Sequence, residues 1–350
     1  MSLLLIEENA ESFFPLTLTC ATFELRFGAM SALERARQIG DDIVLRCRPH
    51  LAAYLRLKTG LRVNEDFEGE GELFPVLPED APWKILALSA DLIASDFENW
   101  AARRANFRDI ALMNGAHVVG SPNEIHIGAR SVVQPGCVLD CTHGPIMLGE
   151  DVSVKWSQIK GPVFVGDGCV LDGARVRQGT SIGAHCKIGG EVSASIFQGR
   201  TNKAHEGFVG HSWIGRWANL GALATTSNLK NTLGNIRFQR DSSTRFDTQM
   251  QFLGSLIGDY SKIGVGQMLT TGSNIGVGCN IFGGRVAPSY VPSFCWGGAD
   301  GWQEYRFDKF LETARATMAR HDIEVRSEIE AILREIFMQT QSERRAVFGL

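Results

Sequence analysis

The sequence has no strong excess of charge of either sign and no long apolar run. Charged residues make up 21% of its 350 residues, and the formal net charge is −4. Without a basic cluster, general binding to nucleic acid or to an anionic membrane surface is not expected. No apolar stretch reaches the roughly 18 residues that a membrane-spanning helix needs. The composition therefore predicts small-molecule partners, no nucleic acid and no membrane span.

Signals for export and for metal binding are also missing. Met1 to Glu7 is a short apolar run with no basic segment before it and no small-residue cleavage site after it. The eight cysteines form neither a CxxC motif nor a Cys/His cluster at zinc spacing. We therefore expect a cytoplasmic protein with reduced, buried thiols and no metal site.

Residues 1–115 alternate short apolar runs with helical patterns, which predicts a compact α/β domain. Neither GxGxxG nor GxxxxGK[ST] occurs in this part, so no motif indicates a phosphate-binding loop. Strands are expected at Leu3 to Ile6, Ile43 to Cys47 and Ile85 to Leu88, and helices at 29–39 and 51–58.

Glycine is abundant only after Gly115, where it follows an aliphatic residue at intervals close to multiples of six. A six-residue period fits a triangular coil in which the aliphatic residue points inward and glycine occupies the corner, where positive φ has little cost. Residues 116–291 therefore predict a left-handed parallel β-helix. The repeated pairs are Ile127-Gly128, Leu148-Gly149, Val165-Gly166, Ile182-Gly183, Ile188-Gly189, Val209-Gly210, Ile214-Gly215, Leu220-Gly221, Ile257-Gly258, Ile263-Gly264 and Ile275-Gly276.

The aliphatic period is interrupted between Asn231 and Gln251, where arginines and an aspartate predict a loop pushed out of the solenoid. From Pro292 onward the apolar residues recur at helical spacing in two blocks, 307–318 and 323–336. Residues 292–350 are therefore expected to form a C-terminal segment of two amphipathic helices.

The densest group of polar residues within the solenoid surrounds His205. An imidazole that titrates near neutrality can take a proton from an attacking amine or hydroxyl, and Glu191 or Glu206 would orient it. A lone histidine is more often a surface or packing residue, so spacing alone leaves both interpretations open. The same holds for Lys203, Lys230 and Arg177, which suit an anionic substrate but also a solvated face.

At these residues the sequence becomes recognisable. The segment GGEVSASIFQGRTNKAHEGFVGHSWIGRWANLGALATTSNLKN (189–231) resembles the acyltransferase coils of the bifunctional glucosamine-1-phosphate N-acetyltransferase/N-acetylglucosamine-1-phosphate uridylyltransferase family. The resemblance is greatest to a divergent bacterial branch of sugar nucleotidyltransferase-like proteins. It extends to FPLTLTCATFELRFGAMSALERA (14–36), FLGSLIGDYSK (252–262) and TTGSNIGVGCNIFGG (270–284).

The resemblance implies an acetyl-CoA-dependent N-acetyltransferase for an amino-sugar phosphate, in nucleotide-sugar or cell-envelope precursor synthesis. It implies a homotrimer with the site between adjacent solenoids. His205 would be the catalytic base. Phe208 and Leu229 stand where the family has tyrosines, and the loss of both hydroxyls leaves the identity of the acceptor sugar open. The resemblance also implies substrate contacts from Arg177, Glu191, Asn202, Lys203, Asn219, Asn228 and Lys230, and acetyl-CoA contacts from Ala222 and, on a neighbouring chain, from Asp259 and Lys262.

The N-terminal part departs further from the family. The related branch resembles TRP followed by an acidic-Leu-Arg segment, whereas here Cys20 and Ala21 follow Thr19. Arg26, in Glu24-Leu25-Arg26, is the nucleotide-contacting residue that remains. We therefore expect a reduced nucleotidyltransferase-like domain, with Mg²⁺ required only if it is active.

Two alternatives to acetyl transfer stay open. The N-terminal domain would make a nucleotide sugar in the manner of a sugar-1-phosphate nucleotidyltransferase, or the solenoid would be a non-catalytic trimeric scaffold that binds a nucleotide sugar. Binding of a nucleoside triphosphate would favour the first alternative, whereas the loss of both tyrosine hydroxyls favours the second.

Overall fold

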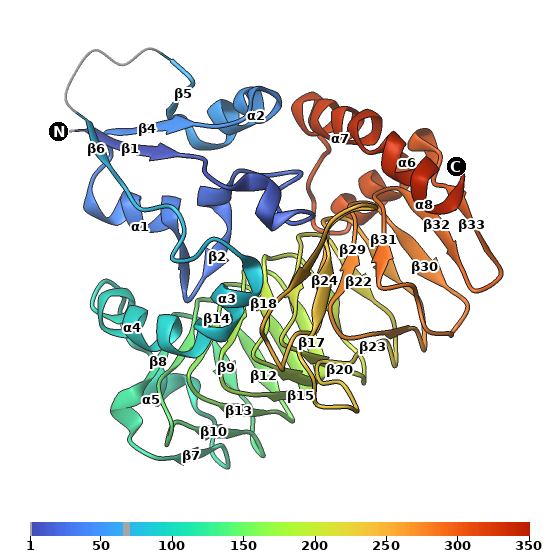
Figure 1. The fold of residues 1–350 in the computed structure, drawn as a ribbon. Helices are drawn as coiled ribbons and strands as arrows, with labels where there is room; N and C mark the ends of the chain where they lie inside the picture. Colours follow the sequence, from blue (N-terminus) through green and yellow to red (C-terminus); the bar gives the residue numbers. More distant parts are fainter. Residues whose placement is uncertain (1, 66–70) are drawn as a thin grey trace.

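The computed structural model describes residues 2–65 and 71–350. The chain forms an N-terminal α/β part, a left-handed parallel β-helix and C-terminal helices (Figure 1). The fold class expected from the sequence is therefore confirmed. In Figure 1 the N-terminal part (blue) and the C-terminal helices (red) lie along the same side of the solenoid.

A four-stranded parallel sheet is the centre of the N-terminal part. Its strand order is β5-β4-β1-β6, with β1 (Ser2–Ile6), β4 (Ile43–Arg46), β5 (Arg62–Val63) and β6 (Gly71–Leu73). The strands expected at Leu3 to Ile6 and Ile43 to Cys47 are β1 and β4. Two short 3-10 helices, η1 (Ala10–Phe13) and η2 (Thr22–Glu24), and a hairpin of β2 (Arg26–Phe27) and β3 (Met30–Ser31) complete the irregular segments before the solenoid. A third 3-10 helix, η3 (Pro122–Glu124), lies within the first coil of the solenoid.

The first helix begins at a capping box, which sets its start later than the apolar pattern suggests. Ser31 accepts a hydrogen bond from the Glu34 amide, and the Glu34 carboxylate accepts one from the Ser31 amide. One expectation is wrong: Ile85 to Leu88 is not a strand, because Pro82 starts a helix there and four apolar residues fit either structure. The helices are α1 (Ala32–Ile39), α2 (Pro49–Thr59), α3 (Pro82–Ala87), α4 (Ser89–Ala101) and α5 (Arg108–Ala111).

The β-helix is built mainly from two long sheets whose strands stack in parallel register. One sheet has nine strands: β8 (Ile125–Ile127), β11 (Ile146–Leu148), β14 (Val163–Val165), β16 (Thr180–Ile182), β18 (Ile196–Phe197), β21 (Trp213–Ile214), β26 (Ser255–Ile257), β29 (Ser273–Ile275) and β31 (Tyr290–Val291). The other has fourteen: β7 (His117–Val119), β9 (Val132–Val133), β10 (Val138–Asp140), β12 (Ser153–Lys155), β13 (Gln158–Lys160), β15 (Val170–Val176), β17 (Lys187–Ser193), β19 (Asn202–Lys203), β20 (Phe208–Gly210), β22 (Asn219–Leu220), β27 (Lys262–Ile263), β30 (Asn280–Phe282), β32 (Cys295–Gly298) and β33 (Gly301–Glu304). β23 (Thr225–Thr226) pairs separately with β28 (Met268–Leu269).

The glycines of the aliphatic-Gly pairs are needed for a different reason from the one expected. None of them has a positive φ. At Gly128, for example, an added Cβ would lie 2.6 Å from the backbone of Gly149 in the next coil. Positive φ falls further along the corner and is often adopted by larger residues, including Arg200 and Trp217. Close backbone contact between coils, rather than left-handed geometry, therefore fixes the glycine period.

The two long sheets differ in what covers their outer faces. In the nine-stranded sheet, strands such as Val163–Val165 and Ser255–Ile257 are buried at every residue. Their inward residues fill the coil, while outward residues such as Trp213 and Leu256 lie in a core shared with the N-terminal and C-terminal parts. The other sheet alternates buried and partly exposed residues, as at Ser153–Lys155. An open surface on the solenoid is therefore found on that second sheet.

The segment between Asn231 and Gln251 leaves the solenoid as expected, and it forms an antiparallel hairpin. Its strands are β24 (Arg237–Gln239) and β25 (Arg245–Asp247). Phe238 and Phe246 lie 5.4 and 5.8 Å from the ring of Trp83 in α3, measured between centroids. The hairpin thus packs against the N-terminal part.

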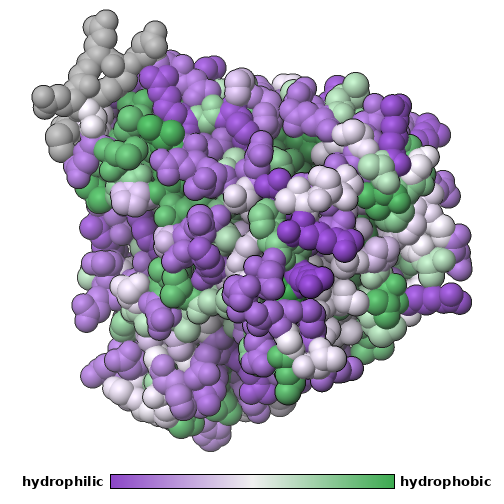
Figure 2. Space-filling model, in the orientation of Figure 1, coloured by the Kyte–Doolittle hydropathy of each residue, from purple (hydrophilic) through white to green (hydrophobic). Residues whose placement is uncertain are grey.

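The segment expected to be helical from residue 292 begins with β32 and β33, which extend the solenoid sheet before the helices start. Three helices follow, α6 (Phe307–Ala319), α7 (Ser327–Gln339) and α8 (Gln341–Phe348), and α7 packs against α2. None of the helices described is both long enough and apolar enough to cross a bilayer. Figure 2 shows that one face of the molecule is mostly hydrophilic, with its hydrophobic residues in small groups.

We predict that Gly215→Ala destabilises the protein. The added Cβ would lie 2.4 Å from Oδ1 and 2.7 Å from the backbone nitrogen of Asp259, so the coils would have to separate. We expect a loss of about 2–3 kcal/mol in the free energy of unfolding, measured by urea denaturation. Gly40→Ala is the control, because no atom lies within 4 Å of its added Cβ. Equal stability of the two variants would contradict the stacking argument.

Candidate functional site

His205 lies on a corner of the solenoid between β19 and β20, and its side chain is exposed. The corner of the following coil stacks directly on it, since the Leu223 amide donates to the Glu206 carbonyl at 2.7 Å. Ala222 precedes Leu223 in that corner. The structure therefore brings His205 and Ala222 onto neighbouring coils, at the edge of the sheet with the open outer face.

The carboxylates near His205 do not orient it as expected. Oε1 of Glu191 accepts a hydrogen bond from Nε of Arg177 at 2.7 Å, and Glu206 binds Nη2 of Arg175 at 2.9 Å. Within the described part of the chain, the imidazole of His205 has no hydrogen-bond partner. Both acids instead hold two arginines beside the corner, where they balance the arginine charge in the free protein.

Lys203 lies beneath the His205 corner with only 1% of its surface exposed. Its Nζ donates to the carbonyl oxygens of Gly189, at 2.8 Å, and His205, at 2.5 Å. Burial lowers the pKa of the Lys203 amine to about 8, while Glu206 opposes that change. A positive charge is therefore held against the backbone of the corner at neutral pH.

The expected asparagine contacts fall into two pairs. Nδ2 of Asn202 donates to Oδ1 of Asn219 at 2.6 Å, and the two residues are in register on β19 and β22. Nδ2 of Asn228 lies 2.8 Å from Nδ1 of His211, whose ring stacks on Phe252. Burial lowers the pKa of His211. These amides extend the polar surface on either side of His205.

Two residues expected to contact acetyl-CoA, Asp259 and Lys262, are engaged within the chain, and Lys262 is in register with Asn219. Asp259 is 4% exposed and lines a cavity beneath the N-terminal part, where it accepts hydrogen bonds from Thr19 Oγ1 and the Arg216 amide. It occupies a different corner from Ala222, and its expected contact with acetyl-CoA bound at a neighbouring chain stays a prediction. The amine of Lys262 binds the Trp217 carbonyl at 2.8 Å, and burial lowers its pKa to about 8.

The remaining expected residues lie at the margins. Lys230 donates to the Asn235 carbonyl at the base of the inserted hairpin. Arg26 forms an ion pair with Glu34 at 2.9 Å, and its guanidinium lies over the ring of Phe164. Phe164 belongs to the covered sheet of the solenoid, so Arg26 does not lie on the open sheet beside His205. The sequence reasoning missed Arg175 and His211. Arg175 was detectable, because it stands two residues before Arg177 in the sequence, whereas the burial of His211 has no signal in the repeat.

That the N-terminal part requires Mg²⁺ only if it is active stays a prediction. Within residues 2–65 and 71–350, no group of three potential metal ligands converges. Glu24 is bound by Lys58 at 2.5 Å, and Asp259 by Thr19 at 2.6 Å. Although burial opposes it, Lys58 and Arg216 lower the pKa of Glu24, so its charge is already compensated within the protein.

Comparison with known sequences finds that the chain is similar to GlmU proteins. The chain is 28% identical over 192 residues to the bifunctional protein GlmU of Synechococcus elongatus, and the match covers 53% of this chain and 37% of that protein. It is 24% identical over 189 residues to GlmU of Cyanothece sp., with 53% and 36% covered. The resemblance expected from the sequence is confirmed. The match spans little more than a third of the length of these GlmU relatives.

Other comparisons add less. No family model matches the chain. The polySia specific acetyltransferase NeuO is 16% identical with a TM-score of 0.30, and the match covers 56% of this chain and 86% of NeuO. The UDP-N-acetylglucosamine acyltransferase from Campylobacter jejuni is 11% identical with a TM-score of 0.29, covering 64% and 94%.

We predict that Lys203 gives the protein a pH-dependent stability. Its pKa is about 8 in the folded chain and near 10.5 when unfolded, so the unfolded state binds more protons between these values and stability rises with pH. Relative to Lys203→Met, the wild type should gain about 2 kcal/mol in free energy of unfolding between pH 7 and pH 9.5. Parallel pH dependence of the two proteins in urea denaturation would refute this.

Proposed function

We propose that the protein transfers an acetyl group from acetyl-CoA to the amine of a sugar phosphate of the glucosamine 1-phosphate type. The observation that carries this proposal is the exposed imidazole of His205, which stands on a solenoid corner stacked against Ala222 in a chain that resembles GlmU proteins. These relatives support a sugar-related acyltransferase or nucleotidyltransferase. The arginine-rich surface beside His205 favours the former.

The reaction would use His205 as a general base. Its ring nitrogen takes the proton of the sugar amine while the amine nitrogen attacks the thioester carbonyl carbon of acetyl-CoA. The tetrahedral oxyanion then collapses, the carbon–sulfur bond breaks, and the CoA thiolate leaves and takes a proton. A backbone amide of the stacked Ala222 corner is suited to stabilise the oxyanion, because such amides are fixed before the reaction.

The cationic residues near His205 would hold the phosphate. Arg175 lies in β15 and Arg177 directly follows that strand, and both are about half exposed, with 43% and 52% of their side chains accessible. Their present partners, Glu206 and Glu191, are also accessible, so a phosphate dianion competes for them in water at little cost. Lys203 adds a fixed charge below the corner.

A homotrimer is part of this proposal. The corner next to Ala222 exposes Leu223 at 61%, and the following corner exposes Val265 at 69%. Apolar side chains on successive corners are suited to contact with a neighbouring solenoid, which would complete the acetyl-CoA site that one chain leaves open. A cytoplasmic location fits an enzyme that consumes acetyl-CoA.

His205→Ala should lower the rate of acetyl transfer by about 10²-fold or more, the usual contribution of a general base. Thiol release from acetyl-CoA with glucosamine 1-phosphate as acceptor measures it. His143→Ala is a matched control, because His143 is also an exposed turn histidine and contacts only Thr142.

Full activity of the His205→Ala variant would remove His205 from the mechanism. Pyrophosphate release from UTP and N-acetylglucosamine 1-phosphate, without thiol release in the first assay, would instead establish nucleotidyl transfer. Silence of both reactions would favour the non-catalytic scaffold.

A further inference from the structure

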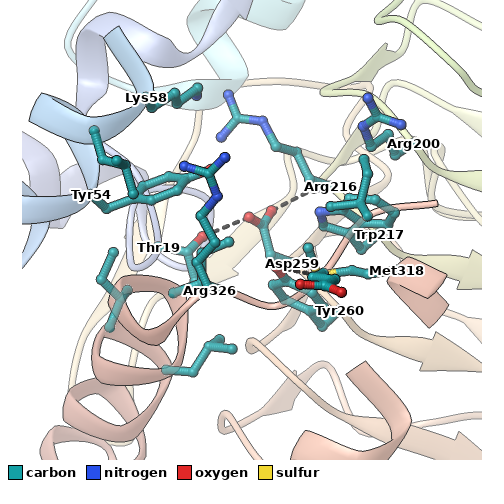
Figure 3. A pocket seen from close by; sticks show the side chains of 16 residues that line it. Thr19, Tyr54, Lys58, Arg200, Arg216, Trp217, Asp259, Tyr260, Met318 and Arg326 are labelled. Atoms are coloured by element: carbon teal, nitrogen blue, oxygen red, sulfur yellow. Dashed lines mark hydrogen bonds between the residues drawn. The ribbon is translucent and has the colours of Figure 1, made fainter. Parts of the chain in front are cut away.

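A cavity of about 490 Å³ lies where three parts of the chain meet, away from the His205 corner. The N-terminal part contributes Thr19 from an irregular segment and Tyr54 and Lys58 from α2, the solenoid contributes corner residues, and the C-terminal segment closes it with the turn before α7 and with α7 itself (Figure 3). A volume of this order is typical of small-molecule sites. It exceeds the space that a single inorganic ion fills.

Cations outnumber acids around this cavity. Four basic side chains line it, Lys58, Arg200, Arg216 and Arg326, but only two acids, Asp259 and Glu324. In the view of Figure 3, Arg216 and Arg326 enter the space between Tyr54 and Trp217. The cations come from α2, from two solenoid corners and from the turn before α7, so no local sequence feature explains why they converge.

Of the two acids, Asp259 is already engaged and Glu324 is exposed, whereas two of the arginines have no ion-pair partner in the described structure. The carboxylate of Asp259 is held by Thr19 and by the backbone amide of Arg216. Across the described ranges of the chain, neither Arg200 nor Arg326 has an ion-pair partner, and Arg200 only lies over the Trp217 ring, 5.3 Å from its centroid. Arg200 is partly buried and Arg326 is exposed, so both guanidinium groups can bind an anion, and at Arg200 the anion would also offset the cost of partial burial.

The positive region continues beyond the cavity. An adjoining cavity of about 200 Å³ shares Lys58 and Arg216 and adds Arg26 and Arg37. Glu24 and Glu34 in that cavity are paired with Lys58 and Arg26. Because the cations outnumber the paired acids, an anionic group can approach along a surface of net positive charge, which concentrates such ligands near the opening.

We propose that this cavity binds a small organic phosphate, with its phosphate groups on Arg200, Arg216 and Arg326 and its organic part between Tyr54 and Trp217. Planar guanidinium groups match phosphate oxygens in bidentate geometry. The apolar part of the lining, which includes Met318, Ile332 and Leu333, suits the organic portion and not a bare ion. A nucleotide and a sugar phosphate share this chemistry.

Isothermal titration calorimetry on the full-length protein tests the proposal with UTP, glucosamine 1-phosphate, coenzyme A and inorganic phosphate, at one ionic strength. At least one organic phosphate should bind, and Arg326→Gln and Arg200→Gln should each weaken that binding by about tenfold or more. Arg326 is exposed and makes no side-chain hydrogen bond in the described structure, so its variant should keep the melting temperature of the unliganded wild type.

Two control variants separate this cavity from the candidate acetyl-transfer site. Arg345→Gln removes an exposed charge on α8 and should retain the binding; Arg177→Gln removes a charge beside His205 and should retain the part of the binding that Arg326→Gln and Arg200→Gln weaken. Which organic phosphate binds identifies the ligand as nucleotide or sugar phosphate. The proposal fails if no organic phosphate binds, if inorganic phosphate binds equally well, or if binding survives both cavity variants or depends on Arg177 instead.

Discussion

Backbone-to-backbone stacking of successive coils is the constraint on which the rest of the structure depends. Glycine stands wherever a Cβ would enter the neighbouring coil, as at Gly128 and Gly215. This contact fixes the register, so that one residue per coil falls in line along a face, as Arg175, Glu191 and Phe208 do. The outward side chains of successive coils therefore form columns along the solenoid, and a column is interrupted only at an insertion or at a corner.

The fold was predictable because this constraint is written directly into the sequence as an aliphatic-Gly period. The period does not reveal backbone conformation, which is why positive φ was assigned to the wrong corner positions. Short apolar runs were less informative, since Ile85 to Leu88 suits a strand or a helix equally and only its neighbour Pro82 decides between them. The hairpin between Asn231 and Gln251 was detected as a break in the period, but its packing against Trp83 depends on a distant segment.

The candidate site was predictable only in part, for the same physical reason. His205 could be found as a polar residue that breaks the repeat. Ala222 could be found only through the family resemblance, and the structure places it on the neighbouring coil. The partners of Glu191 and Glu206 follow from which outward side chains share a register, and the sequence pattern leaves that open. The cavity has no sequence signal at all, because Thr19, Arg216 and Arg326 meet only after three distant segments have packed together.

Packing gives the N-terminal part a structural role that does not depend on any catalytic activity of its own. The outward residues of the nine-stranded sheet, such as Trp213 and Leu256, are apolar and lie in one core with Phe13 and Phe294. Removing the cover would expose that surface to water at about 25 cal/mol per Å² of apolar area. It would also remove Thr19, whose hydroxyl donates a hydrogen bond to the buried carboxylate of Asp259. The N-terminal part therefore has a structural role, because it covers the face of a sheet that cannot face solvent.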